Sequence, residues 1–174
     1  MKYWSILLVL FLLSTSCKKK EKVDYETSFF DISQYVDSLL QVKSTSVINR
    51  EINLNGKKEK VKLESNDLTE IFEFLKQFNI NRPKWYDKYD VNRYKNEVSY
   101  HTTDENLDIK ELTVVYNTQN KVEEINILYK SHTLISNTQK KVVWRPTERL
   151  EYNNISGTLW SNPDDVDISW TYSL

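Results

Sequence analysis

Alternating apolar and polar residues are the feature of this 174-residue chain that most restricts its fold. In "IKELTVVY" and "KVEEINILY", residues 109–116 and 121–129, apolar side chains tend to recur at every second position. A strand points successive side chains to opposite faces, so this period predicts antiparallel strands with one buried and one wet face. Further short strands are expected at 94–103, 132–137, 140–145, 148–153 and 165–173.

Two turns set the expected register of the strands. Asn55-Gly56 is a strong hairpin signal, because a two-residue type I′ turn needs positive φ at both central positions. A turn centred there pairs Leu54 with Lys57, and a slip of one residue would move the apolar set to the other face. In the same hairpin, Ile48 is expected opposite Leu63. A second turn, near Gln119-Asn120, gives three expected pairs: Leu112–Ile127, Val114–Ile125 and Tyr116–Glu123.

Two segments have the apolar spacing of helices. "TSFFDISQYVDSLLQV" predicts a helix over about 28–42, with Thr27 or Ser28 as its cap. "NDLTEIFEFLKQFNINRP" predicts a second helix that ends before Pro83. One side of this second helix would carry Leu68, Ile71, Phe72, Leu75 and Phe78.

Together these segments predict an α+β domain. We expect a curved antiparallel β-sheet of about six to eight strands packed on one or two helices, with a closed or half-open barrel as the variant. Neither a convincing internal repeat nor a linker between domains is apparent in the sequence. Residues 28–174 are therefore expected to form a single domain.

The N-terminus has a different pattern. Met1-Lys2 precedes roughly ten apolar residues, about half of the 20 that a bilayer-spanning helix needs. Small residues at 14–16 then lead to Cys17, the single cysteine of the chain. A basic start, a short apolar run and small residues are typical of a secretory signal peptide.

This segment resembles the signal peptides of bacterial lipoproteins, in which a leucine and two small residues precede a lipid-modified cysteine. Thr15 and Ser16 match the small positions, whereas Ser14 replaces the leucine, which lies one step earlier at Leu13. The resemblance implies that residues 1–16 are removed and that lipid is attached to Cys17. The alternative is an ordinary secretory peptide with an incidental cysteine.

The resemblance also implies a location. Residues 17–27 would be the lipidated cysteine and a charged tether to the domain. Lys18 stands where an aspartate would favour the inner membrane, and the tether lacks the acidic cluster that marks surface export in some bacteria. The resemblance therefore implies an outer-membrane protein of the bacterial cell envelope, anchored on the periplasmic face.

Composition argues against several classes of partner. The 24 basic and 25 acidic residues are nearly balanced, so there is no electrostatic case for binding nucleic acid. With two glycines in the chain and none of the glycine-rich phosphate loops, no nucleotide cofactor is expected. His101 and His132 are the two histidines, too few for the three or four ligands of a typical zinc site, so no metal site is expected.

Carboxylate pairs are the candidates for catalysis. Asp104-Glu105 and Asp164-Asp165 could act as acid and base in the hydrolysis of a glycan. Both pairs lie in turn-like contexts, where aspartate is favoured for local hydrogen bonds to the backbone. We expect them to belong to turns.

Aromatic residues beside charged ones are the candidates for binding. In "RPKWYDKYDVNRY", Trp85, Tyr86 and Tyr89 could stack on a glycan or contact a protein partner. The alternative is that these rings cover the open end of the core. Trp144, Trp160 and Trp170 are expected in the core or on a sheet face.

Two functional classes follow. The first is a membrane-anchored envelope lipoprotein, held by lipid on Cys17, which binds a protein, lipid or glycan without catalysis. The second is an enzyme that acts on an envelope polymer through carboxylates.

Overall fold

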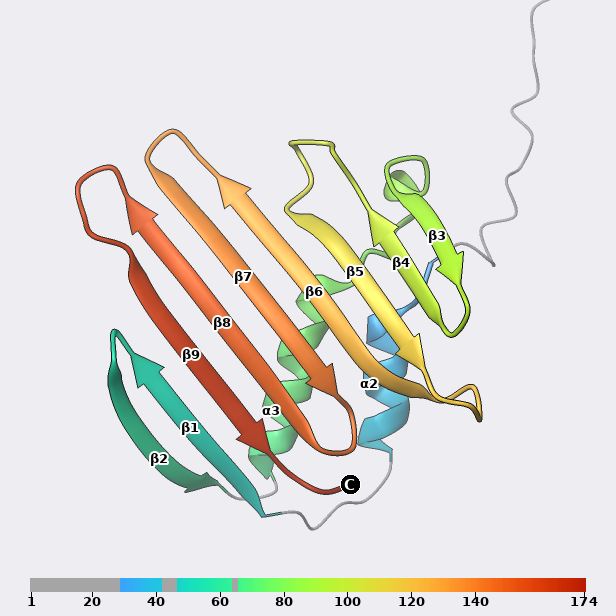
Figure 1. Ribbon diagram of the computed structural model, residues 1–174, viewed down its shortest axis with the longest axis horizontal. Helices are drawn as coiled ribbons and strands as arrows, with labels where there is room; N and C mark the ends of the chain where they lie inside the picture. Colours follow the sequence, from blue (N-terminus) through green and yellow to red (C-terminus); the bar gives the residue numbers. More distant parts are fainter. Residues whose placement is uncertain (1–28, 42–46, 64–65) are drawn as a thin grey trace, which may run out of the picture.

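The computed structural model describes residues 29–41, 47–63 and 66–174. Within these ranges the chain forms one antiparallel sheet of nine strands and two α-helices (Figure 1). The strands lie in the order β2-β1-β9-β8-β7-β6-β5-β4-β3. The elements are α2 (Ile32–Leu40), β1 (Ile48–Leu54), β2 (Lys57–Leu63), α3 (Asn66–Leu75), the 3-10 helices η2 (Lys76–Phe78) and η3 (Pro83–Trp85), β3 (Asp90–Tyr94), β4 (Glu97–His101), β5 (Ile109–Tyr116), β6 (Val122–His132), β7 (Ser136–Arg145), β8 (Arg149–Thr158) and β9 (Asp164–Thr171).

The α+β class and the antiparallel sheet are confirmed, but the expected six to eight strands are too few. The expected strand 94–103 is replaced by the hairpin of β3 and β4, because Lys95 has a positive φ of 52° and forms a two-residue turn with Asn96. The barrel variant is wrong as well, because the described sheet ends at two edges, β2 and β3, and does not close on itself.

The expected register agrees fully with the structure in one predicted hairpin and only in part in the other. Leu54 faces Lys57 and Ile48 faces Leu63, as the Asn55-Gly56 turn predicted. In the hairpin of β5 and β6, two expected pairs are present: Leu112–Ile127 and Val114–Ile125. The third is wrong, because the register shifts after Val115 and Tyr116 faces Val122.

The first helix begins later than the expected residue 28. Its N-cap is Asp31, whose carboxylate accepts a hydrogen bond from the Gln34 N–H at 3.0 Å. Phe29 and Phe30 precede the cap, and the caps expected from the sequence, Thr27 and Ser28, lie outside the described residues. Aspartate is a favoured N-cap residue, and the extended backbone of an N-cap ends the helix on its N-terminal side.

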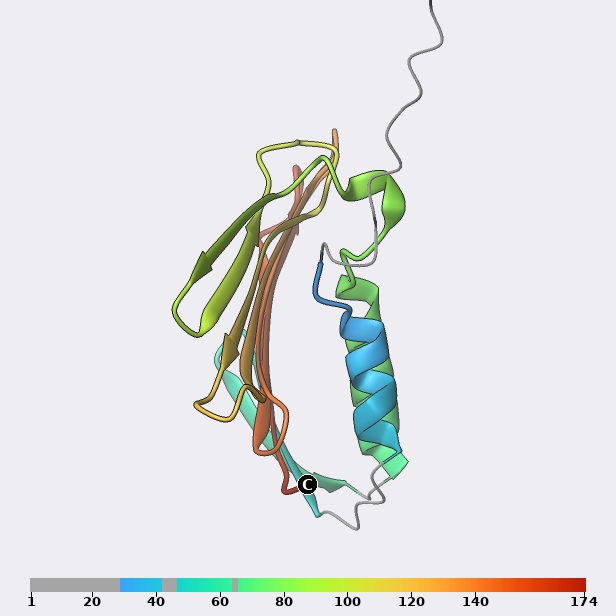
Figure 2. The ribbon, with the colours of Figure 1, turned by 90° about the vertical axis from the view of Figure 1, so that its right-hand side faces the viewer.

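Both helices lie over the same face of the sheet (Figure 2). Between them and the sheet, Trp144 of β7 is fully buried, with ring contacts of 5.3 Å to Phe72 and 5.6 Å to Tyr35. Its indole N–H donates to the Tyr172 hydroxyl at 2.9 Å. Trp170 is also buried, as expected, but the same expectation is wrong for Trp160, which is 79% exposed.

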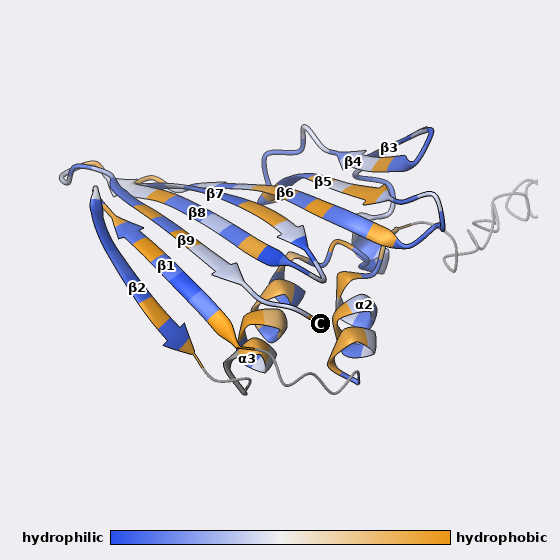
Figure 3. Cartoon of the chain, turned by 60° about the horizontal axis from the view of Figure 1, so that its bottom comes forward, coloured by the Kyte–Doolittle hydropathy of each residue, from blue (hydrophilic) through white to orange (hydrophobic). Residues whose placement is uncertain are grey.

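On the helix-facing side of the sheet, buried apolar residues give way to half-buried polar residues along the strands. Apolar and polar residues alternate along part of β6, whereas β7 is polar from Ser136 to Lys141 and apolar from Val142 to Trp144. Figure 3 colours the strands by hydropathy. On the helix-facing side of β7, Val142 is buried, whereas Thr138 and Ser136 further along are half-buried polar residues. Strands β6 to β9 extend beyond the ends of α2 and α3 (Figure 2). We call residues 131–139 and 153–163 the projecting end.

Among the residues that the structure describes, no helix has both the length and the apolar character that a bilayer crossing requires.

Candidate functional site

Large apolar side chains are exposed on the two loops of the projecting end. Leu134 is 94% exposed in the β6–β7 loop, and Trp160 is 79% exposed in the β8–β9 loop. Ile135 and Leu159 beside them are exposed as well. We call these four residues the apolar tip. Clustered exposed apolar residues usually mark a site of interaction.

The two loops share a sequence motif and a contact between two hydroxyl groups. One reads Thr-Leu-Ile-Ser from residue 133, and the other reads Thr-Leu-Trp-Ser from residue 158. In the first, the hydroxyls of Thr133 and Ser136 are 2.8 Å apart, and in the second, those of Thr158 and Ser161 are 3.0 Å apart. Each loop also has one backbone hydrogen bond between its threonine and its serine. The hydroxyl pairs close each turn and leave its two apolar residues outside.

Direct contact joins the two loops into one unit. The Leu159 N–H donates to the Ile135 carbonyl oxygen at 3.1 Å. Behind the second loop, Gly157 packs closely against Pro163, where a Cβ would lie 3.3 Å from the proline Cα. The apolar tip is thus presented by a hydrogen-bonded pair of turns.

The projecting end carries no formally charged residue of the Asp, Glu, Lys or Arg type. This covers the two runs 131–139 and 153–163, in a chain in which 28% of residues are charged. Lys130 and Lys140 lie at the base of the first run, whereas Asp164 and Asp165 of β9 lie beside the second run, opposite Ser156 and Ile155. The four residues of the apolar tip are themselves uncharged, which suits burial of the tip against another apolar surface.

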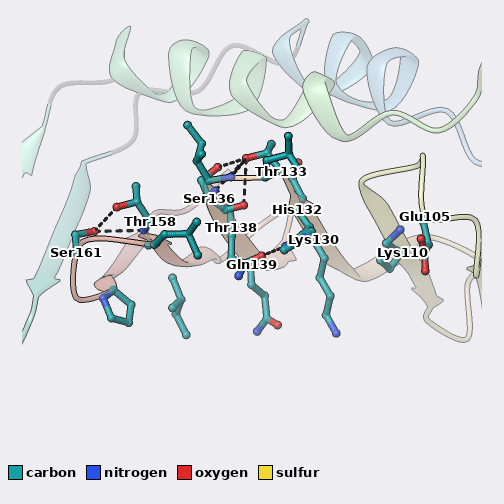
Figure 4. A pocket seen from close by; sticks show the side chains of 18 of the residues that line it. Glu105, Lys110, Lys130, His132, Thr133, Ser136, Thr138, Gln139, Thr158 and Ser161 are labelled. Atoms are coloured by element: carbon teal, nitrogen blue, oxygen red, sulfur yellow. Dashed lines mark hydrogen bonds between the residues drawn. The ribbon is translucent and has the colours of Figure 1, made fainter.

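A groove of about 910 Å³ lies beside the apolar tip. In Figure 4, Lys130 and Gln139 extend from it away from the helices, whereas Thr158 and Ser161 lie on the helix side. His132 is engaged with the Asn137 amide oxygen through its Nδ1. The groove is open and lined mostly by hydroxyl, amide and apolar groups, which suits contact more than proton transfer.

The structure corrects the binding site expected at Trp85, Tyr86 and Tyr89. Tyr89 is 6% exposed, and its hydroxyl donates to the Ile109 carbonyl oxygen at 2.7 Å. Burial raises the pKa of Tyr89 to about 12. The expectation of an exposed aromatic patch is therefore wrong for this residue, which belongs to the core.

Trp85 and Tyr86 are half-buried. The Arg82 guanidinium lies 4.5 Å from the centre of the Trp85 ring. The Tyr86 hydroxyl donates to Asn81 Oδ1 at 2.9 Å, and its ring meets Phe29 edge-on at 5.2 Å. Both rings thus help to close the core over Tyr89, and a partner contact through these half-buried rings stays a prediction.

The carboxylate pairs make local bonds. Asp104 accepts two hydrogen bonds from Asn106, through its backbone and side-chain nitrogens, and these bonds lower the pKa of Asp104. Asp165 accepts from Asn153 Nδ2 at 2.9 Å, and Asp164 accepts from Asn55 at 3.1 Å. These bonds tie turns and neighbouring strands together.

Metal ligands are scattered in the described ranges, which contain no group of three or more His, Cys, Asp or Glu residues able to hold an ion. His101 is exposed at the end of β4. Cys17 lies outside the described residues.

Sequence reasoning missed the apolar tip. A short strand was expected over residues 132–137, which placed Leu134 in a strand, although Thr133 and Ser136 turn the chain there. The repeated Thr-Leu-x-Ser, present twice in the second half of the chain, is the signal that would have revealed the tip.

Searches of family models, curated proteins and solved structures each give no match to this chain. Function is therefore argued from the geometry of the site.

Proposed function

We propose that this protein is a lipid-anchored envelope protein that binds its partner, a protein, lipid or glycan, through the apolar tip. The observation that carries the proposal is the pair of Thr-Leu-x-Ser loops, which hold Leu134 and Trp160 in solvent. Keeping large apolar groups exposed is unfavourable in water, so a chain that does so on two linked turns is suited to contact. Tryptophan is also the residue most enriched among binding hot spots, together with Tyr and Arg.

In this proposal, lipid on Cys17 anchors the protein to the membrane. The lipoprotein-type signal peptide at residues 1–16 supports lipid attachment there, and residues 17–27 would tether the domain of residues 28–174. Lys18, in place of an aspartate, supports a location in the outer membrane, and the lysine-rich tether supports attachment to the periplasmic face of that membrane. The sheet, curved and packed on its two helices, would act as a rigid support for the tip.

Binding is favoured over hydrolysis of an envelope polymer. Asp104 and Asp165, candidate catalytic carboxylates, accept hydrogen bonds from Asn106 and Asn153 that serve the fold. The tip, in contrast, is made of side chains that form none of the core.

Site-specific photo-crosslinking in living cells tests the binding surface. A photoreactive amino acid replaces Leu134, and a matched variant carries it at Thr147, an exposed residue of the β7–β8 turn. We expect a light-dependent adduct at position 134 and none at 147, and the mass of the adduct identifies the partner as protein, lipid or glycan. The absence of any adduct at position 134 would refute the binding surface.

Mass spectrometry of the mature N-terminus tests the anchor. We expect residues 1–16 to be absent and Cys17 to carry acyl chains, and Cys17→Ser should leave an uncleaved or mislocalised precursor. Fractionation of the envelope then places the protein in the inner or outer membrane. An unmodified Cys17, or cleavage elsewhere, would refute the anchor.

A further inference from the structure

We propose that the apolar tip inserts into the lipid bilayer to which Cys17 is anchored. This inference rests on the proposed function and names the partner of the tip as a lipid surface. The protein would then meet the membrane at two points, the lipidated cysteine and the tip. Two attachments restrict the orientation of a domain more than one does.

The length of chain before the described residues favours this partner. Eleven residues, 18–28, separate Cys17 from Phe29, and they span at most about 40 Å when fully extended. The domain is therefore kept within reach of the bilayer, which gives the lipid surface a high effective concentration at the tip.

The described chain also begins at the same end of the sheet as the projecting end, on the side of β3 to β5 (Figure 1). The Phe29 ring lies 5.7 Å from the ring of Tyr89, whose hydroxyl bonds to Ile109 of β5. Next to it, the Asp108 carbonyl oxygen accepts from the Lys130 N–H at 2.7 Å, at the base of the projecting end. Figure 2 shows that α2 begins at the end of the helix layer nearer to the loop tips. The described chain therefore begins at the end of the sheet that carries the apolar tip.

The chemistry of the tip suits lipid. Leu134, Ile135 and Leu159 are aliphatic, and Trp160 has an apolar ring with one polar N–H, the character that favours the membrane interface. Charged groups are costly inside a bilayer, and the four residues of the apolar tip are uncharged. Asp164 and Asp165 of β9, opposite Ser156 and Ile155, would stay outside the hydrocarbon.

Hydrogen bonding within the loops favours the same partner. An unpaired backbone group costs several kcal/mol in hydrocarbon, roughly the value for transfer without a partner. In the tip, the Thr133 N–H donates to the Ser136 carbonyl oxygen, and the Leu159 N–H donates to the Ile135 carbonyl oxygen. These bonds satisfy backbone groups that would otherwise have to leave water unpaired.

Fluorescence in protein-free vesicles tests the inference. The lipidated mature protein is reconstituted in vesicles of phosphatidylethanolamine and phosphatidylglycerol that contain lipids spin-labelled on the acyl chain. Both proteins carry Trp85→Phe, because Trp85 is half-buried and would add its own signal. We expect the label to quench tryptophan emission in the Trp85→Phe protein, and the further change Trp160→Tyr to remove most of this quenching, because Trp144 and Trp170 are buried in the domain. Equal quenching in the two proteins, or none in the Trp85→Phe protein, would overturn the inference.

A second pair of variants separates insertion from a general change in the fold. Leu134→Ser should reduce the quenching of Trp160 without a shift of the melting temperature, because Leu134 is 94% exposed. The matched control is Val47→Ser, which alters an exposed apolar residue before β1 at the other end of the sheet and should leave the quenching unchanged. Equal effects of the two substitutions would contradict insertion through the tip.

The two proposals fail separately. If the vesicle experiment shows no quenching while the photoreactive residue at position 134 captures a protein or glycan, the membrane inference is wrong and the binding surface stands. If neither experiment detects a contact, both are wrong. A lipid adduct at position 134 together with quenching of Trp160 supports both.

Discussion

Trp144 and Trp160 lie at opposite ends of the same group of strands and have opposite surroundings. Trp144 is 0% exposed, in contact with two aromatic rings and hydrogen-bonded to Tyr172, whereas Trp160 is 79% exposed. We call the part of the sheet that packs against α2 and α3 the covered end. It is held together by large apolar side chains. The projecting end is held together by hydrogen bonds among small hydroxyl residues, such as Thr158 and Ser161, which leave its apolar residues outside. The residues that stabilise the fold and the residues exposed for contact thus lie at opposite ends of the strands.

The largest expected effect is the contrast between the two tryptophans themselves. Trp144→Ala should lower the free energy of unfolding by about 3–5 kcal/mol, because it leaves a cavity and removes the hydrogen bond to the Tyr172 hydroxyl. Trp160→Ala should change it by no more than about 0.5 kcal/mol, as is usual for exposed positions. Denaturation by urea measures both, and similar losses for the two variants would show that the ends are not separate.

Leu75 of α3 gives the same contrast through a helix. Leu75→Ala should cost about 2–5 kcal/mol, because this side chain is 0% exposed on the helix face that packs on the core. Leu134→Ala in the tip is the matched control and should leave the melting temperature almost unchanged. A thermal melt unaffected by Leu75→Ala would contradict the burial of this face.

Tyr172 gives the covered end a dependence on alkaline pH. Burial raises its pKa above the ordinary value of 10.0, although the hydrogen bond from Trp144 opposes this. The folded state thus favours the neutral phenol, so this stability is fully present below pH 10 and is lost as pH rises toward the folded pKa.

Tyr172→Phe tests this dependence. The variant should be less stable by about 1 kcal/mol at pH 8, because the Trp144 N–H loses its acceptor. The difference from the wild type should shrink as the pH rises above 10, because the variant has no phenol at this position to ionise. Urea titrations at several pH values measure the difference, and a constant gap would contradict the assignment.

The smallest expected effect concerns the hydroxyl pairs of the projecting end. Thr158→Val should change the free energy of unfolding by about 0.5 kcal/mol or less. It should nevertheless speed hydrogen exchange at the Leu159 N–H, because the loss of the bond to Ser161 loosens the turn. Thr147→Val in the β7–β8 turn is the control. Unaltered exchange at Leu159 would show that the hydroxyl pair does not hold the loop.

Local signals in the sequence predicted the parts of the fold that depend on neighbours in the chain. The Asn55-Gly56 turn predicted the whole register of β1 and β2, because its conformation selects one pairing. The period of two predicted the antiparallel sheet. Lys95 was missed, because a positive φ at a lysine is not expected from residue type.

The surroundings of the aromatic residues could not be predicted in the same way. Tyr89 is buried by contacts with Phe29 and Ile109, which are distant in sequence and have no pattern that links them to it. Trp160 is exposed because β8 and β9 extend past the helices, and strand length relative to helix position is not readable from alternation. The residue types of the site were visible in the sequence, but their exposure was not.

The order of strands in the sheet has a consequence for how the protein folds. The hairpin of β1 and β2 closes locally, yet β1 also pairs with β9, so that Arg50 lies opposite Trp170 near the other end of the chain. Pairings of such high sequence separation close large loops and form slowly. One edge of β1 therefore stays unpaired until β9 has been made. In the exported protein that we propose, the sheet can be completed only after β9 has crossed the membrane.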